Sequence, residues 1–134
     1  MAFDDVIASI GNELGMDMAV KDGVAEFAIA PEDGGERVVV SASAMDDGVS
    51  VELCADLGEM PSEGASELML RMLEANHLFA STGGATLSVD GGRVKLERYV
   101  GIAEFERGEG LSIVASFIET AKAWSDIVVH SAES

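Results

Sequence analysis

The alternation of hydrophobic and polar residues is most unusual at residues 67–78, where it predicts a helix with a very wide apolar surface. At 100° per residue, Glu67, Arg71 and Glu74 form a narrow polar stripe, in which Arg71 can pair with either carboxylate. A helix that rests on one core needs an apolar stripe of about 100° or slightly more. Here the apolar side chains span an arc of about 200°, and they are Leu68, Met69, Leu70, Met72, Leu73 and Ala75.

The surplus apolar surface predicts that this helix has a second packing partner. In a chain this short, a second copy of the same helix is the simplest candidate, which predicts a homodimer. The methionines favour an interface, because flexible thioethers fill irregular surfaces. The alternative is a central helix enclosed within its own chain. The predicted dimer residues are Leu68, Met69, Leu70, Met72 and Leu73.

A β-hairpin is predicted directly after this helix. Leu87 and Val89 alternate with polar residues, and the alternation resumes at Val94 and Leu96. Between them, the sequence Asp-Gly-Gly at 90–92 tolerates positive φ, as a tight hairpin turn requires.

The first part of the chain predicts one helix and three strands. Helical spacing over Phe3–Leu14 defines a single apolar face, carboxylates occupy the first turn, and Gly15 is suited to end the helix. Strands are predicted within 19–30, over 37–44 and from Val49 onward, with turns at 31–35 and 46–48. Val38 and Val40 should face one side of the sheet and Val39 the other. Short connections favour an antiparallel meander.

The remaining segments complete the predicted fold. A loop at 58–64 leads to the central helix, with Ser62 or Ser66 as its N-cap. A second loop covers 101–110, a last helix with one apolar face covers 111–128, and residues 129–134 should fray. The prediction is therefore a single α+β domain over 1–134, in the order α-β-β-β-α-β-β-α, with an antiparallel twisted sheet flanked by helices and a homodimer through the second helix.

The amino-acid composition argues against several classes of function. Eight Lys and Arg against 25 Asp and Glu give a net charge of −17, which repels phosphate backbones and anionic lipid surfaces, so nucleic-acid binding is not expected. No segment approaches the roughly 20 apolar residues of a membrane span. The start of the chain lacks the basic and long apolar regions of a secretory signal, so a cytoplasmic location is expected.

A search for catalytic chemistry finds no supporting pattern. His77 and His130 have no cysteine, histidine or carboxylate at the spacing of metal ligands. Cys54 lies on a predicted strand without a basic neighbour that would lower its pKa. The Thr-Gly-Gly sequence at 82–84 follows a helix rather than opening one, and lacks the ending of a phosphate-binding loop. The chain is therefore expected to be no enzyme and to need no cofactor or metal.

The residues around the central helix carry a family resemblance. A helix rich in Leu and Met, then Asn-His-Leu-Phe at 76–79, then Thr-Gly-Gly at 82–84, a strand, an Asp-Gly turn and another strand resemble the type III secretion chaperones that serve individual effectors, the Tir chaperone-like family. The resemblance is concentrated in residues 68–99, and the order of elements fits nearly the whole chain.

The resemblance implies a function and a set of contacts. Similar proteins are homodimers in the bacterial cytosol, and they bind the N-terminal segment of a secreted effector in extended form without ATP. By this resemblance, the contacts to the effector are expected at Phe3 and Val6 on the first helix and at Phe27, Ile29 and Val39 on the strands. A dimeric regulatory protein or a small-ligand-binding domain of the same fold remains an alternative.

Overall fold

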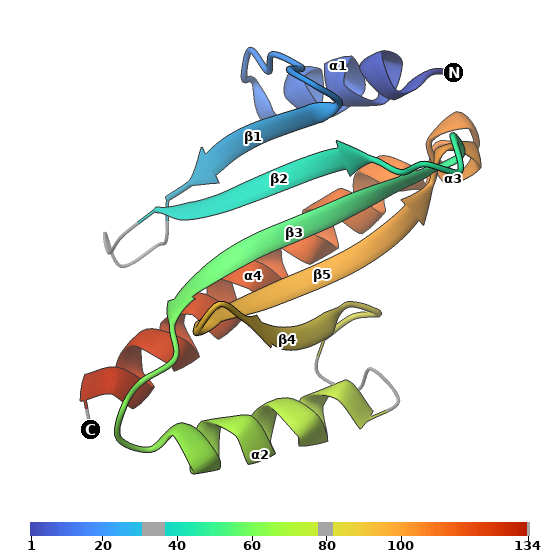
Figure 1. Cartoon of the computed structure of the whole chain (residues 1–134). Coiled ribbons are helices and arrows are strands. Elements are labelled where there is room, and N and C mark those ends of the chain that lie inside the picture. The colour runs from blue at the N-terminus through green and yellow to red at the C-terminus, as the bar shows by residue number, and fades with distance from the viewer. Residues whose placement is uncertain (31–36, 78–81, 134) are drawn as a thin grey trace.

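The computed structural model describes residues 1–30, 37–77 and 82–133, and it shows an α+β fold built on one antiparallel sheet (Figure 1). The predicted fold class is confirmed. The predicted turn at 31–35 and the predicted end of the central helix at Leu78 lie outside the described residues. In chain order the elements are α1 (Phe3–Leu14), β1 (Val24–Ile29), β2 (Val38–Ala44), β3 (Ser50–Glu59), α2 (Ala65–Asn76), β4 (Thr86–Asp90), β5 (Arg93–Gly101), α3 (Ile102–Glu106) and α4 (Gly110–Glu133).

The first helix has the predicted bounds, and local interactions fix both of its ends. At the start, the backbone N–H of Ala2 donates to the Asp5 carboxylate at 2.8 Å, so a first-turn acid stabilises the positive end of the helix. At the other end, Gly15 takes the left-handed conformation, with φ of 68°, that closes helices without the penalty of a Cβ atom.

The sheet has the strand order β1-β2-β3-β5-β4, so β1 and β4 are its two edges. The predicted hairpin is confirmed: β4 and β5 pair in register from Thr86 with Glu97 to Asp90 with Arg93. Gly91 and Gly92 both have positive φ, 60° and 76°, which a two-residue turn between twisted strands requires.

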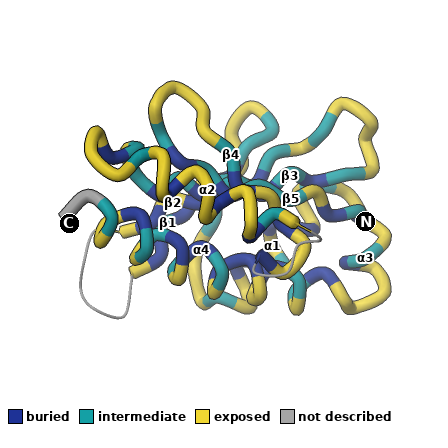
Figure 2. Tube along the Cα trace, turned by 90° about the horizontal axis from the view of Figure 1, so that it is seen from below, coloured by how far each residue is buried: buried dark blue, intermediate teal, exposed yellow. Residues whose placement is uncertain are grey.

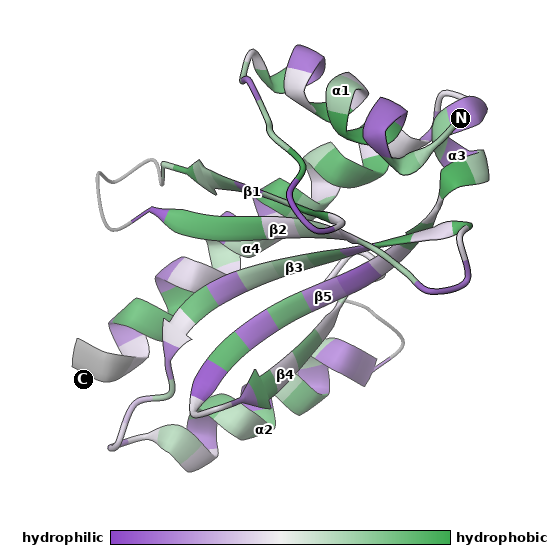
Figure 3. Cartoon of the chain, turned by 45° about the horizontal axis from the view of Figure 1, so that its top comes forward, coloured by the Kyte–Doolittle hydropathy of each residue, from purple (hydrophilic) through white to green (hydrophobic). Residues whose placement is uncertain are grey.

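The core lies between one face of the sheet and the helices α1, α3 and α4, as the buried segments in Figure 2 show. The strands alternate between buried apolar and more exposed polar positions, which gives β3 and β5 the banded colouring of Figure 3. Val38 and Val40 are buried and Val39 is exposed, as predicted. We call the face that these helices leave uncovered the outer face of the sheet.

Val49 departs from the predicted alternation of the third strand. It precedes β3 and is one of the exposed valines. The Asp47 carboxylate accepts the backbone N–H groups of both Val49 and Ser50 at 2.9 Å, so Val49 belongs to the turn. The buried face of β3 therefore begins at Val51.

The second helix begins at Ala65, earlier than predicted, and its N-cap is Gly64 rather than Ser62 or Ser66. Gly64 has a φ of 79°, so the chain enters the helix through a conformation that favours glycine, and neither serine provides a cap. The helix lies along the β4 edge of the sheet, away from α1 (Figure 1), and its start lies close to Ser131 near the end of α4.

The last part of the chain is more helical than predicted. The short helix α3 occupies part of the predicted loop at 101–110, and the Glu104 carboxylate accepts the Gly101 N–H at 2.8 Å at its start. Helix α4 extends to Glu133, into the stretch expected to fray. Its predicted apolar face is confirmed by the burial of Val114, Phe117, Ile118, Ala121, Trp124 and Val128.

Candidate partner-binding surfaces

Helix α2 carries an apolar surface that its own chain does not cover. Met69, Leu70 and Leu73 expose 43 %, 58 % and 67 % of their surface. On the opposite side, Leu68 and Met72 are buried in the core. Of the five predicted dimer residues, the structure therefore uses two within the chain and leaves three available for contact.

The charged stripe of α2 also differs from the prediction. Among the residues that the structure describes, Arg71 forms no ion pair, although Glu67 and Glu74 lie one turn away on each side. An exposed arginine flanked by two carboxylates borders the apolar surface of α2.

The edge strand β1 has backbone groups with no partner in the described part of the chain. The Ala44 N–H donates to the Gly23 carbonyl at 2.8 Å. Because antiparallel pairing alternates, the residues at odd positions of β1 face β2, and Val24, Glu26 and Ala28 point their N–H and C=O groups outward. Val24 forms a bridge with Lys21, but the outward groups of Glu26 and Ala28 form no hydrogen bond with any described residue.

A groove of about 430 Å³ lies beside this open edge. Its wall is mostly apolar and comes from α1, from the end of β1 and from the middle of α4, with charged groups of Arg37, Glu119 and Lys122 at its margin. The residues that line it are Leu14, Met16, Ala28, Ile29, Ala30, Arg37, Ala115, Ile118, Glu119 and Lys122.

The opposite edge, β4, is closed by α2. The side-chain amide of Asn76 donates to the Leu87 carbonyl at 2.9 Å, and the Leu87 N–H donates to the Asn76 side-chain oxygen at 2.8 Å. Leu87 is a β4 residue whose backbone points away from β5. The two edges of the sheet are therefore not equivalent.

The predicted effector contacts fall into three groups. Val6, Phe27 and Ile29 are buried in the core, although Ile29 also lines the groove. Phe3 is half-buried and packs against the core. Val39 is exposed on the outer face, opposite the groove. The residues that the resemblance assigns to the partner therefore do not form one surface, because three of them are buried in the core and Val39 lies on the opposite face of the sheet.

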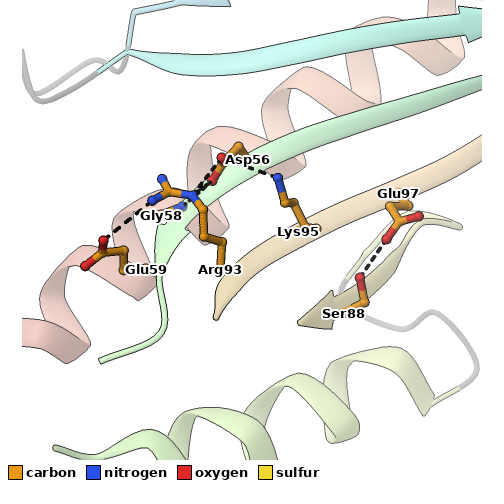
Figure 4. A network of polar contacts seen from close by, with 7 residues as sticks. All are labelled: Asp56, Gly58, Glu59, Ser88, Arg93, Lys95 and Glu97. Atoms are coloured by element: carbon orange, nitrogen blue, oxygen red, sulfur yellow. Dashed lines mark hydrogen bonds and ion pairs between the residues drawn. The ribbon is translucent and has the colours of Figure 1, made fainter. Parts of the chain in front are cut away.

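The outer face of the sheet carries a network of ionic contacts (Figure 4). Asp56 accepts hydrogen bonds from Arg93, at 2.8 and 3.0 Å, and from the Gly58 N–H, and its carboxylate lies 3.4 Å from the Lys95 ammonium. Partial burial alone would raise the pKa of Asp56, but these three partners together lower it. Glu97 accepts a hydrogen bond from Ser88 at 2.6 Å.

The same face shows no sign of an active nucleophile. Burial, followed by the negative charge of Glu97, raises the pKa of the Cys54 thiol. The same two causes raise the pKa of Glu52. A thiol with a raised pKa is protonated at neutral pH and is a weak nucleophile. In the described residues, no group of three or more His, Cys, Asp or Glu side chains could hold a metal ion.

Sequence reasoning missed Glu26, Ala28 and Asn76. The first two act through backbone groups, so their side chains give no signal. The Asn76 contact joins the end of a helix to an edge strand, which becomes visible only once α2 is placed beside β4. Among the described helices, none is both long and apolar enough to cross a membrane.

Comparison with known proteins gives one family and several similar folds. A sequence model of the Tir chaperone protein (CesT) family matches residues 5–125. None of the curated protein sequences that were compared matches the chain.

Three solved structures illustrate the shared fold. A chain of the heterodimeric complex ExoU–SpcU from the type III secretion system of Pseudomonas aeruginosa has a TM-score of 0.68 at 16 % identity, covering 93 % of this chain and 96 % of that chain. A chain of the HopA1–SchA chaperone–effector complex has a TM-score of 0.63 at 14 % identity, with 92 % and 93 % covered. A chain from the Yersinia pestis type III secretion chaperone SycH in complex with a stable fragment of YscM2 has a TM-score of 0.63 at 14 % identity, with 89 % and 96 % covered.

Proposed function

The chain belongs to the Tir chaperone protein (CesT) family, and from this premise we propose that it binds the N-terminal segment of a secreted effector in extended form and keeps it competent for type III secretion, without ATP. The observation that carries the proposal is the open edge of β1 next to an apolar groove. An extended segment needs both features: main-chain partners for affinity and pockets for alternate side chains for selectivity.

Strand addition at β1 accounts for the main-chain contacts. Glu26 and Ala28 each present one donor and one acceptor outward, at the two-residue spacing with which an antiparallel or parallel strand pairs. Side chains on one face of the added strand enter the groove near Leu14, Met16 and Ile118. Ordering an extended segment costs conformational entropy, so the segment must bury a large area before binding becomes tight. We therefore expect the effector segment to continue beyond β1 over further apolar surface.

A homodimer through α2 is part of the same proposal. Met69, Leu70 and Leu73 are the residues that support it, because they form the exposed apolar surface of α2. Leu68 and Met72 contribute by holding the helix on its own chain. The single domain over 1–134 and a location in the bacterial cytosol also remain proposals.

The large negative charge fits a chaperone whose partner is prone to aggregate, because a net charge far from zero keeps a complex in solution. Catalysis has no part in the proposal. Two of the similar structures, HopA1–SchA and SycH with YscM2, are complexes of chaperones, and the raised pKa of the Cys54 thiol does not favour a nucleophile.

Co-expression with candidate secreted proteins tests the proposal. Each candidate is supplied as the full protein, without its N-terminal segment, and as that segment alone, and capture is measured in nucleotide-free buffer. We expect capture of the full protein and of the isolated segment, and loss of capture on truncation. Capture that depends on the folded C-terminal domain instead would make the chain a regulator of a folded partner.

A further inference from the structure

The contact between Asn76 and Leu87 has the geometry of strand pairing. Two hydrogen bonds of 2.8 and 2.9 Å join the side-chain amide of Asn76 to both backbone groups of one β4 residue. A carboxamide offers one acceptor and N–H donors, the same groups that a peptide unit offers. The Asn76 side chain thus occupies the position that the backbone of a neighbouring strand would take.

The remaining outward groups of β4 are too few to hold a strand. Before the strand, the Ala85 N–H donates to the Thr82 carbonyl at 3.2 Å. With Leu87 occupied by Asn76, Val89 is the only β4 position in the described chain whose outward backbone groups have no partner. By contrast, β1 offers two successive outward positions, Glu26 and Ala28. Backbone hydrogen bonding therefore favours β1 for strand addition and disfavours β4.

We propose that Asn76 is a specificity-determining residue that closes the β4 edge, so that a partner segment is accepted only along β1 and each protomer takes one added strand. This inference rests on the strand addition of the proposed function. Closure also prevents two copies from pairing edge to edge at β4, the usual hazard of an uncovered strand.

The fold of α2 sets the position of this side chain. Leu68, Met72 and Ala75 are buried beneath the helix and fix its rotation. Asn76 is the last helical residue, and at His77 the backbone turns to an extended conformation, with ψ of 112°. Aspartate at position 76 would accept from the Leu87 N–H but could not donate to its carbonyl while ionised, and alanine would make neither hydrogen bond.

Amide hydrogen exchange on the ¹⁵N-labelled protein tests the closure directly. In the wild type we expect the Leu87 amide to exchange slowly, and the amides of Glu26, Ala28 and Val89 to exchange rapidly. Replacing Asn76→Ala should accelerate exchange at Leu87 by about fivefold, since a hydrogen bond contributes about 1 kcal/mol and 1.4 kcal/mol corresponds to a factor of ten. Val114→Ala is the control, because it removes core packing on α4 but leaves α2 and the carboxamide in place; it should lower the melting temperature and leave β4 closed.

Two synthetic peptides test which edge accepts a strand, each extended by lysines for solubility. A peptide with the sequence of residues 38–44, the natural neighbour of β1, should protect Glu26 and Ala28 in all variants. A peptide with the sequence of residues 93–101, the natural neighbour of β4, should protect Leu87 and Val89 only in the Asn76→Ala variant.

Other outcomes separate this inference from the proposed function. Three results would each overturn the role of Asn76. They are protection of Val89 by the second peptide in the wild type, rapid exchange at Leu87 in the wild type without peptide, and no protection of β4 by the second peptide in Asn76→Ala. If the first peptide protects nothing at β1, strand addition itself fails, whereas the exchange rates at Leu87 still test the closure.

Discussion

Arg93 at the start of β5 donates through Nε to both carboxylate oxygens of Asp56 on β3, although 37 positions separate the two residues in sequence. The contact lies beside a β-bulge, where Asp56 pairs with Lys95 and the next paired residue, Gly58, faces Val94. The Asp56 carboxylate also accepts the Gly58 N–H at 3.0 Å, so it ties the bulge to the neighbouring strand. A β-bulge bends its strand and increases the local twist. The contacts of Asp56 with Arg93 and Gly58 stabilise the bulge at this position of β3.

The first prediction concerns Asp56 and pH. Its pKa is lowered in the folded protein, so it stabilises the fold above its ordinary pKa, and this stability is lost as pH falls through the lowered value. We expect Asp56→Asn to lower the free energy of unfolding by about 1 kcal/mol at pH 7, and by much less below pH 3. Urea denaturation at both pH values measures the difference.

The matched control for Asp56 is Glu59→Gln. Glu59 also pairs with Arg93, but at 3.8 Å and with a carboxylate that is mostly exposed, so solvent screens the interaction and no measurable change is expected. Equal effects of the two substitutions would show that the bifurcated hydrogen bond from Arg93 Nε to Asp56 contributes no more stability than the exposed ion pair with Glu59.

The second prediction concerns Glu52, whose pKa is shifted in the opposite direction to that of Asp56. Burial and the neighbouring Glu97 raise the pKa of Glu52, so its ionised form destabilises the fold at neutral pH, and stability rises as pH falls through the raised value. Glu52→Gln should therefore increase the free energy of unfolding at pH 7, by less than about 1 kcal/mol because solvent screens part of the side chain. Glu26→Gln, on the exposed edge, is the control, and a destabilising Glu52→Gln would contradict the prediction.

The third prediction concerns the dimer. Leu70→Glu or Leu73→Glu should place an unpaired charge in the α2 interface and cost several kcal/mol of association. Light scattering should then give the 14.0 kDa mass of a single chain, and twice that mass for the wild type. Val49→Glu makes the same change at an exposed valine outside α2 and should leave the dimer intact. A wild-type chain that scatters as a monomer at micromolar concentration would remove the basis for this prediction.

The periodicity of apolar residues was sufficient to predict most of the helices and strands, but only part of how the surface of α2 is used. The apolar positions of α1, α4 and the strands repeat strongly, so burial and element type follow from them; α1 was predicted with its observed bounds. The wide arc of α2 indicated more apolar surface than one core can cover, and the structure leaves Met69, Leu70 and Leu73 exposed, but the arc did not indicate which residues face the core. Leu68 and Leu70 are equally apolar in sequence, and only the docking of α2 against β4 separates the core residue from the exposed one.

The open edge of β1 could not be predicted from side chains. The family resemblance assigns Val6 and Phe27 to the partner, but in the structure both side chains are buried in the core. The open groups at Glu26 and Ala28 depend on hydrogen-bond register, which one residue of slippage would reverse. Register was fixed by the turns and by the buried face together, so it became known only with the structure.

The last prediction tests strand addition at β1 by removing one backbone donor. Proline has no N–H, and it is tolerated on an edge strand where that N–H faces solvent. The N–H of Ala28 faces outward, so Ala28→Pro should leave the pairing of β1 with β2 intact while removing one hydrogen bond to an added strand and hindering its approach. We expect the melting temperature to change little and capture of the effector segment to fall at least tenfold, because both the lost hydrogen bond and the displaced strand weaken binding.

Two controls make the Ala28 result specific. Ala28→Ser keeps the N–H and should keep capture near the wild-type level. Ala25→Pro removes an N–H that faces β2, so it should lower the melting temperature strongly, because it breaks the ladder between β1 and β2. If Ala28→Pro retains full capture in a folded protein, the segment does not add at β1, and the groove between α1 and α4 must bind it through side chains alone. If capture and melting temperature fall together in Ala28→Pro, as in Ala25→Pro, the outward direction assigned to the Ala28 N–H is wrong.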